Sequence, residues 1–106
     1  NHSAEDEKDL SKVTMSLDLF RTFTKGFLKA CPGLTEEERY ALPLGAMTMT
    51  LECGIRFLTD YLDGDHYFRI HYADQNLDRC RTQFKLVRDM EEQFEAMAAV
   101  VAKYAK

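Results

Sequence analysis

Apolar residues recur at three- and four-residue steps through most of this chain, and that spacing predicts α-helices. The first run begins after Ser16, whose hydroxyl suits a helix N-cap, and Cys31-Pro32-Gly33 ends it. The apolar positions of this run are expected to form one buried face: Leu19, Phe20, Phe23, Phe27 and Cys31.

Two further helices are predicted in the middle of the chain. Thr35 and Glu38 have the spacing of a capping box, so a short helix should run to about Ala41. Pro43 suits the first turn of a central helix that continues to Leu62. The apolar positions of the central helix keep helical spacing for about five turns: Leu44, Met47, Leu51, Ile55, Leu58 and Leu62.

Glycines mark special points of the central helix. Gly45 and Gly54 each weaken intrinsic helicity by ~1 kcal/mol relative to alanine, so we expect them to permit close approach of another helix. Gly64 supplies a stop after the helix. Residues 65–75 then form an aromatic connection, with a short extended piece expected over 66–70.

One long C-terminal helix is predicted from about 77 to 104, with Asn76 as its cap. Its near-heptad apolar stripe is Leu77, Cys80, Phe84, Val87, Met90, Phe94, Met97, Val101 and Tyr104. The predicted fold is therefore all-α, a single helical unit over residues 1–106 with one central and one long C-terminal helix. The stripe also leaves open a non-catalytic function, as a helical dimerisation or interaction module.

Composition excludes several classes of protein. The net charge of −4 and the scattered lysines and arginines argue against nucleic-acid binding. No apolar run approaches the ~20 residues of a membrane span. The three cysteines, Cys31, Cys53 and Cys80, are widely separated and include no Cys-x-x-Cys, which favours reduced thiols in the cytoplasm over a disulfide framework or a zinc site.

The segment Arg56–Arg69 concentrates polar and aromatic chemistry at the end of the central helix. Arg56 and Asp60 are four residues apart, so the simplest interpretation is an ion pair beside aromatic core residues. The alternative is a sugar site. Arg56 would donate to hydroxyl groups, Asp60 and Asp65 would accept from them, and Tyr67 would offer a ring face and a hydroxyl.

No metal site or catalytic group is assigned. Asp63-Gly64-Asp65 could in principle hold Mg²⁺, but it falls at a helix C-terminus, where backbone carbonyls already make the surroundings negative. It also lacks the regular spacing of a calcium-binding EF-hand loop. His66 and His71 have no second ligand pair or nucleophile nearby in the sequence.

Three blocks together carry a resemblance to a known family: Ala4–Val13, Arg56–Arg69 and Asn76–Leu86. In this order they resemble the C-terminal part of bacterial phosphotransferases of the aminoglycoside-phosphotransferase and choline-kinase-like superfamily. The N-acetylhexosamine 1-kinase group is the most similar.

The resemblance covers nearly the whole chain and implies the outer part of a helical kinase C-lobe. It implies a sugar pocket bordered by Arg56, Tyr67 and Phe68. Some relatives carry a mucin-desulfating label, but Cys31-Pro32-Gly33 does not match the Cys-x-Pro-x-Arg motif of sulfatases.

The same resemblance implies an incomplete kinase. No Gly-x-Gly-x-x-Gly or Walker loop, His-Gly-Asp or Asp-Phe-Gly element occurs, so the chain alone is not expected to transfer phosphate. The expected partners are a missing N-lobe and upstream C-lobe, which would hold ATP and Mg²⁺, and a small sugar. Without them, apolar surface on the central helix and around Leu10–Met15 would be bare, so the isolated chain is expected to form a homo-oligomer.

Overall fold

The computed structural model describes residues 3–105 and is all-α, as predicted, with no strand in that range. Its elements are η1 (Leu10–Lys12), α1 (Leu17–Ala30), α2 (Glu36–Tyr40), α3 (Leu42–Leu62), α4 (Gln75–Glu92) and α5 (Phe94–Tyr104). None of the described helices has the length and apolar content that crossing a membrane requires.

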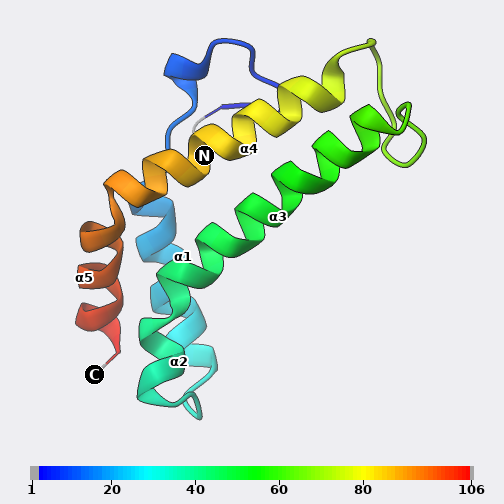
Figure 1. The fold of residues 1–106 in the computed structure, drawn as a ribbon. Helices are drawn as coiled ribbons and strands as arrows, with labels where there is room; N and C mark the ends of the chain where they lie inside the picture. Colours follow the sequence, from blue (N-terminus) through cyan, green and yellow to red (C-terminus); the bar gives the residue numbers. More distant parts are fainter. Residues whose placement is uncertain (1–2, 106) are drawn as a thin grey trace.

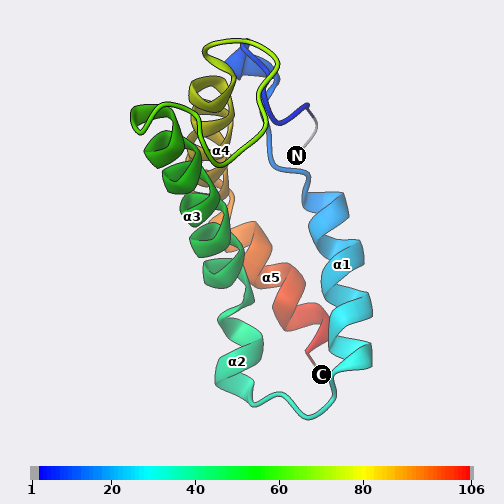
Figure 2. The same cartoon turned by 90° about the vertical axis from the view of Figure 1, so that its right-hand side faces the viewer.

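The molecule is elongated. α3 and α4 run antiparallel as a long hairpin. α1, α2 and α5 gather at the N-terminal end of α3, away from the loop that joins α3 to α4 (Figures 1 and 2). The principal extents are 47 × 27 × 19 Å and the radius of gyration is 15.5 Å. A compact domain of this length would have a radius of gyration of about 13 Å. The helices therefore leave much of their surface without a neighbour.

The predicted starts of α1, α2 and α3 and the stop after α3 are confirmed. The Ser16 hydroxyl accepts a hydrogen bond from the backbone amide of Leu19 at 3.2 Å, which caps α1. Thr35 and Glu38 form the expected capping box at the start of α2. Pro43 lies in the first turn of α3, and Gly64 follows its end with a φ of 98°.

The prediction of one long C-terminal helix is wrong, because the chain turns at Gln93 between α4 and α5. The turn brings α5 back against α1, where Met97 and Val101 become fully buried. The side-chain amide of Gln93 donates to Asp89 at 3.1 Å and to the Met15 carbonyl at 3.5 Å. Much of the apolar stripe is thus core of the same chain, and it is not a continuous coiled-coil seam.

Two local predictions around α4 are also wrong. Asn76 is not the cap of the helix; it lies inside the first turn, fully buried, and Asp74 takes the N-cap position. The Asn76 side chain donates instead to Asp60 of α3 and to Asp65 of the loop. The segment 66–70, expected to be extended, is irregular and bends at Tyr67 and Phe68.

The N-terminal segment is packed against α4. Val13 and Met15 are buried in a cluster with Leu86 and Met97. The backbone amide of Met15 donates to the Asp89 carboxylate of α4. The side chains of Val13 and Met15 and this hydrogen bond together anchor the segment to α4. The expectation of bare surface around Leu10–Met15 is therefore wrong for Val13 and Met15.

The predicted buried face of α1 is only partly covered: Phe20 packs against the core, and Phe27 and Cys31 are half-buried. Leu19 and Phe23 are 61% and 62% exposed, whereas Thr24 and Leu28 are buried. α1 packs mainly on α5, so the contact with α5 decides which face is covered.

One of the two glycine predictions is confirmed. A Cβ on Gly54 would lie 2.6 Å from Cε1 of Phe84, so the bare backbone permits α4 to approach α3 closely. A Cβ on Gly45 would have no neighbour within 4 Å, and the prediction for Gly45 is wrong.

Candidate functional site

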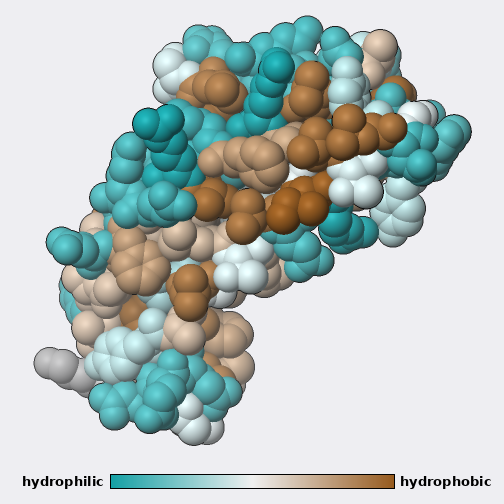
Figure 3. All heavy atoms as spheres, viewed as in Figure 1, coloured by the Kyte–Doolittle hydropathy of each residue, from teal (hydrophilic) through white to brown (hydrophobic). Residues whose placement is uncertain are grey.

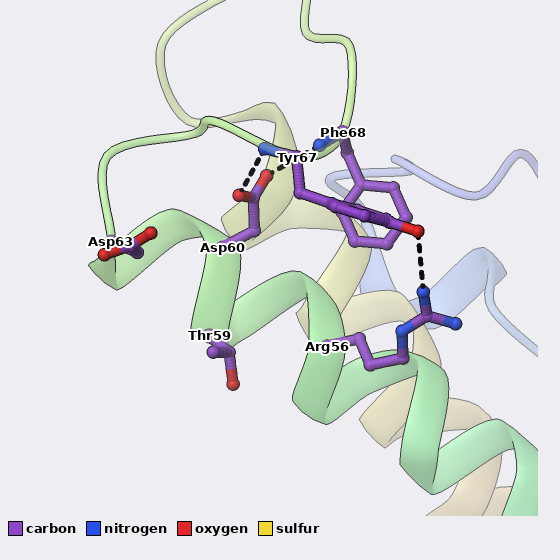
Figure 4. A pocket seen from close by; sticks show the side chains of 6 residues that line it. All are labelled: Arg56, Thr59, Asp60, Asp63, Tyr67 and Phe68. Carbon is purple, nitrogen blue, oxygen red and sulfur yellow. Dashed lines mark hydrogen bonds between the residues drawn. The ribbon is translucent and has the colours of Figure 1, made fainter.

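A cavity of about 360 Å³ opens at the C-terminal end of α3, under the loop that leads to α4. We call it the α3 pocket. Figure 4 shows its lining side chains, which come from the last two turns of α3 and from the loop. They are Arg56, Thr59, Asp60, Asp63, Tyr67 and Phe68.

The backbone that ends α3 creates the pocket. Gly64 and Asp65 both adopt positive φ, at 98° and 62°. The amide of Asp65 donates to the Asp60 carbonyl at 2.8 Å, which closes the turn. Two successive left-handed residues reverse the chain, so that Tyr67 and Phe68 return over the helix they have just left.

Asp60 holds this loop in place. Its buried carboxylate accepts hydrogen bonds from the backbone amides of Tyr67 at 2.7 Å and Phe68 at 3.0 Å, and from the side-chain amide of Asn76 at 2.8 Å. Burial alone would raise the pKa of the Asp60 carboxyl, but the hydrogen bonds from Phe68, Tyr67 and Asn76 together lower that pKa below its ordinary value. Asp60 is therefore held as a carboxylate, with both oxygens occupied.

Arg56 turns toward the aromatic residues of the loop. Its Nη2 donates to the Tyr67 hydroxyl at 3.4 Å, and its guanidinium carbon lies 5.6 Å from the ring centres of both Tyr67 and Phe68. The ion pair with Asp60 that the spacing favoured does not form. Among residues 3–105, the ion pairs of arginines with carboxylates involve Arg21, Arg79 and Arg88. Arg56 therefore keeps donors available at an open pocket.

The two loop aromatics have different environments. Phe68 packs on the core residue Phe57 with ring centres 4.7 Å apart, and Tyr67 meets Phe68 edge-on at 4.9 Å. Tyr67 is 73% exposed, so its ring and hydroxyl are open to solvent, whereas Phe68 is half-buried. Phe68 anchors the loop to the core and Tyr67 presents the surface.

Four of the five residues predicted to bind sugar line the same pocket: Arg56, Asp60, Tyr67 and Phe68. Asp65 does not line it; its Oδ1 accepts from the Asn76 side chain at 3.0 Å. Thr59 and Asp63 were not predicted. They stand three and seven residues after Arg56, so helical spacing placed them on one face with it.

The chemistry of the α3 pocket is hydrogen bonding and aromatic contact. Within the part of the chain that the structure describes, no three His, Cys, Asp or Glu residues are placed to hold a metal ion together. No model of a known protein family matches the chain. The functional proposal below therefore depends on the geometry of the pocket and on the sequence resemblance described above.

Proposed function

We propose that this chain is the substrate-side helical part of a sugar phosphotransferase, similar to N-acetylhexosamine 1-kinases. The observation that carries the proposal is the arrangement of Arg56 beside the exposed ring and hydroxyl of Tyr67 in the α3 pocket. The resemblance of Arg56–Arg69 to the sugar-binding segment of those kinases supports it.

The pocket offers what a small saccharide requires. A sugar ring has an apolar C–H side that packs on aromatic faces, and hydroxyl groups that exchange hydrogen bonds with planar donors and with carboxylates. Tyr67 supplies the face, Arg56 the donors, and Asp63 acceptors at the open side. A volume of about 360 Å³ lies within the range typical of small-ligand sites.

The contacts divide the residues of the proposal into two roles. Arg56 and Tyr67 would touch the sugar, with Phe68 beneath them as the anchored second ring. Asp60 and Asp65 would act indirectly, because their carboxylates are engaged by the loop amides and by Asn76. The inferred reaction is phosphorylation of the anomeric hydroxyl of an N-acetylhexosamine.

Phosphoryl transfer needs groups that these 106 residues do not offer. The proposal assigns ATP and Mg²⁺ binding and the catalytic base to an N-lobe and an upstream C-lobe of the same cytoplasmic enzyme. The outward apolar face of α1, with Leu19 and Phe23, offers surface for contact with such a part. The second candidate, a non-catalytic interaction module, is now favoured by a different observation: apolar side chains are exposed on α3, whereas the C-terminal stripe is largely buried.

The test is sugar phosphorylation by the full-length gene product with ATP and Mg²⁺, scanning N-acetylglucosamine, N-acetylgalactosamine and aminoglycosides. Arg56→Ala removes a charged hydrogen-bond donor and Tyr67→Ala removes an aromatic face. Each substitution should lower kcat/KM for the preferred sugar by roughly tenfold or more, because a tenfold change corresponds to about 1.4 kcal/mol, the scale of one such contact. Arg88→Ala, at an exposed arginine of α4, is the matched control and should leave turnover unchanged. Failure to phosphorylate any N-acetylhexosamine would overturn the proposal and leave the interaction module in first place.

A further inference from the structure

α3 carries an apolar stripe that the rest of the described chain leaves largely exposed. Leu44, Leu51, Ile55 and Leu62 are 58%, 41%, 50% and 75% exposed. They fall within roughly 40° of the helix circumference and extend over roughly 27 Å of its length. Figure 3 shows the corresponding band of hydrophobic atoms crossing the face of the molecule along α3. We call these four residues the α3 stripe.

The α3 stripe is large for a chain of this size. Its four side chains expose on the order of 400 Å² of apolar area, comparable to the largest patch on a typical monomer. Phe84 of α4, which is 37% exposed and touches the backbone of Gly54, adjoins it. Together with the half-buried flanking residues Met47 and Leu58, the apolar area is on the order of 600 Å², and a polar rim would supply the rest of the ~800 Å² that each partner contributes to a standard interface.

We propose that a second copy of this chain covers the α3 stripe, with the two α3 helices antiparallel. A twofold axis requires a surface that matches itself when it is reversed. The stripe has steps of seven, four and seven residues, which read the same in both directions. An axis at the level of Cys53 sets Leu44 against Leu62 of the second copy and Leu51 against Ile55 of the second copy. Every contact in this pairing joins side chains of similar size and apolar character.

This interface leaves the α3 pocket accessible and does not depend on the proposed sugar site. Arg56, Asp60 and Asp63 lie about 100–160° around the helix from the centre of the stripe, and Thr59, at about 60°, is the α3 lining residue nearest to it. The pocket therefore lies on the flank of α3 and the stripe lies beside it. The interface also differs from the C-terminal coiled coil expected from the sequence, because that stripe is largely occupied within the chain.

Sedimentation equilibrium of the 106-residue chain tests the proposal. The mass should rise from 12.3 kDa toward twice that value as the concentration increases through the micromolar range. Leu51→Glu combined with Ile55→Glu should abolish the rise, with the helical circular dichroism retained because both side chains are exposed in the monomer. The matched control is Leu19→Glu with Phe23→Glu on α1, a comparably exposed apolar pair, and it should dimerise as the parent chain does.

Cysteine cross-linking fixes the direction of the helices. In chains whose Cys31 and Cys53 are replaced by serine, a mixture of Leu44→Cys and Leu62→Cys should form mixed disulfides under mild oxidation. Leu44→Cys alone should form few, since its symmetry mate lies at the far end of the helix. A chain that is monomeric at every concentration overturns the proposal. So does dimerisation abolished by the α1 control, or efficient 44–44 cross-linking.

Discussion

Asn76 of α4 donates its side-chain amide to Asp60 of α3 at 2.8 Å and also to Asp65 of the loop at 3.0 Å. The same Asp60 carboxylate accepts the amides of Tyr67 and Phe68. One fully buried asparagine therefore joins the two helices of the hairpin to the loop that forms the pocket.

Asn76→Asp should destabilise the protein strongly. The substitution keeps the size of the side chain but replaces the shared donor with a third carboxylate, next to Asp60 and Asp65. We expect the melting temperature at pH 7 to fall on the order of 10 °C. Gln83→Glu makes the same chemical change at a half-exposed position of α4 and should shift the melting temperature much less. Equal shifts would show that the network contributes nothing special.

The lowered pKa of Asp60 gives a stability that depends on pH. The hydrogen bonds to its ionised form outweigh burial, so its pKa in the folded protein lies below the ordinary 3.8. The stabilisation is therefore present above the unfolded pKa and is lost as pH falls through the folded pKa. Urea midpoints measured from pH 6 down to pH 2.5 should fall less steeply for Asp60→Asn than for the parent chain. Parallel curves would contradict the assignment.

Gly54 and Gly45 offer a matched pair on one helix. Alanine at Gly45 meets nothing within 4 Å, so it should stabilise the protein by up to about 1 kcal/mol through helix propensity. Alanine at Gly54 meets the Phe84 ring, and the resulting overpacking should cost about 1–3 kcal/mol before that gain is counted. Chemical denaturation of both variants measures the difference. A Gly54→Ala variant as stable as Gly45→Ala would mean that α4 shifts without cost.

Helix positions were predictable from local chemistry, and their packing was not. Ser16, the Thr35–Glu38 box and Pro43 act on backbone groups of their own helices, so sequence alone indicates where those helices begin. The turn at Gln93 has no glycine or proline to announce it. It is stabilised by contacts between α5 and α1, which are far apart in sequence. The same contacts decide that Thr24 is buried while Phe23 is exposed.

The candidate site follows the same division. Arg56, Tyr67 and Phe68 were predicted from one short segment through its resemblance to a kinase family, and all three line one pocket. The part taken by Asn76 was missed, because its bond to Asp60 spans sixteen residues and requires the loop to be folded. Asp60 looked like an ion-pair partner of Arg56 by spacing, yet backbone amides that return with the loop occupy it.

Tyr72 should titrate well above the ordinary tyrosine pKa of 10. Its hydroxyl donates to Asp78 at 2.9 Å, and burial, followed by that hydrogen bond, raises the pKa of Tyr72 to about 12. Its contribution to stability is full below the ordinary value of 10 and is lost as pH rises through the folded pKa. Absorbance titration at alkaline pH should show a phenol with a pKa of about 12 that disappears in Tyr72→Phe. If that substitution instead removes an early-titrating phenol, the assignment is wrong.

Thr24 is a buried polar residue whose replacement should help folding. Its side chain is fully buried in α1, and its hydroxyl oxygen has no hydrogen-bond partner within residues 3–105. A buried hydroxyl without a partner costs free energy that an apolar side chain of the same shape avoids, so Thr24→Val should raise the free energy of unfolding by about 1 kcal/mol.

Thr22→Val is the matched control on the exposed side of α1, where the hydroxyl donates to the Asp18 carbonyl at 3.0 Å. It should change the unfolding free energy by less than about 0.5 kcal/mol in either direction. Urea denaturation of both variants at pH 7 makes the comparison. Destabilisation by Thr24→Val would mean that the hydroxyl acquires a partner in solution.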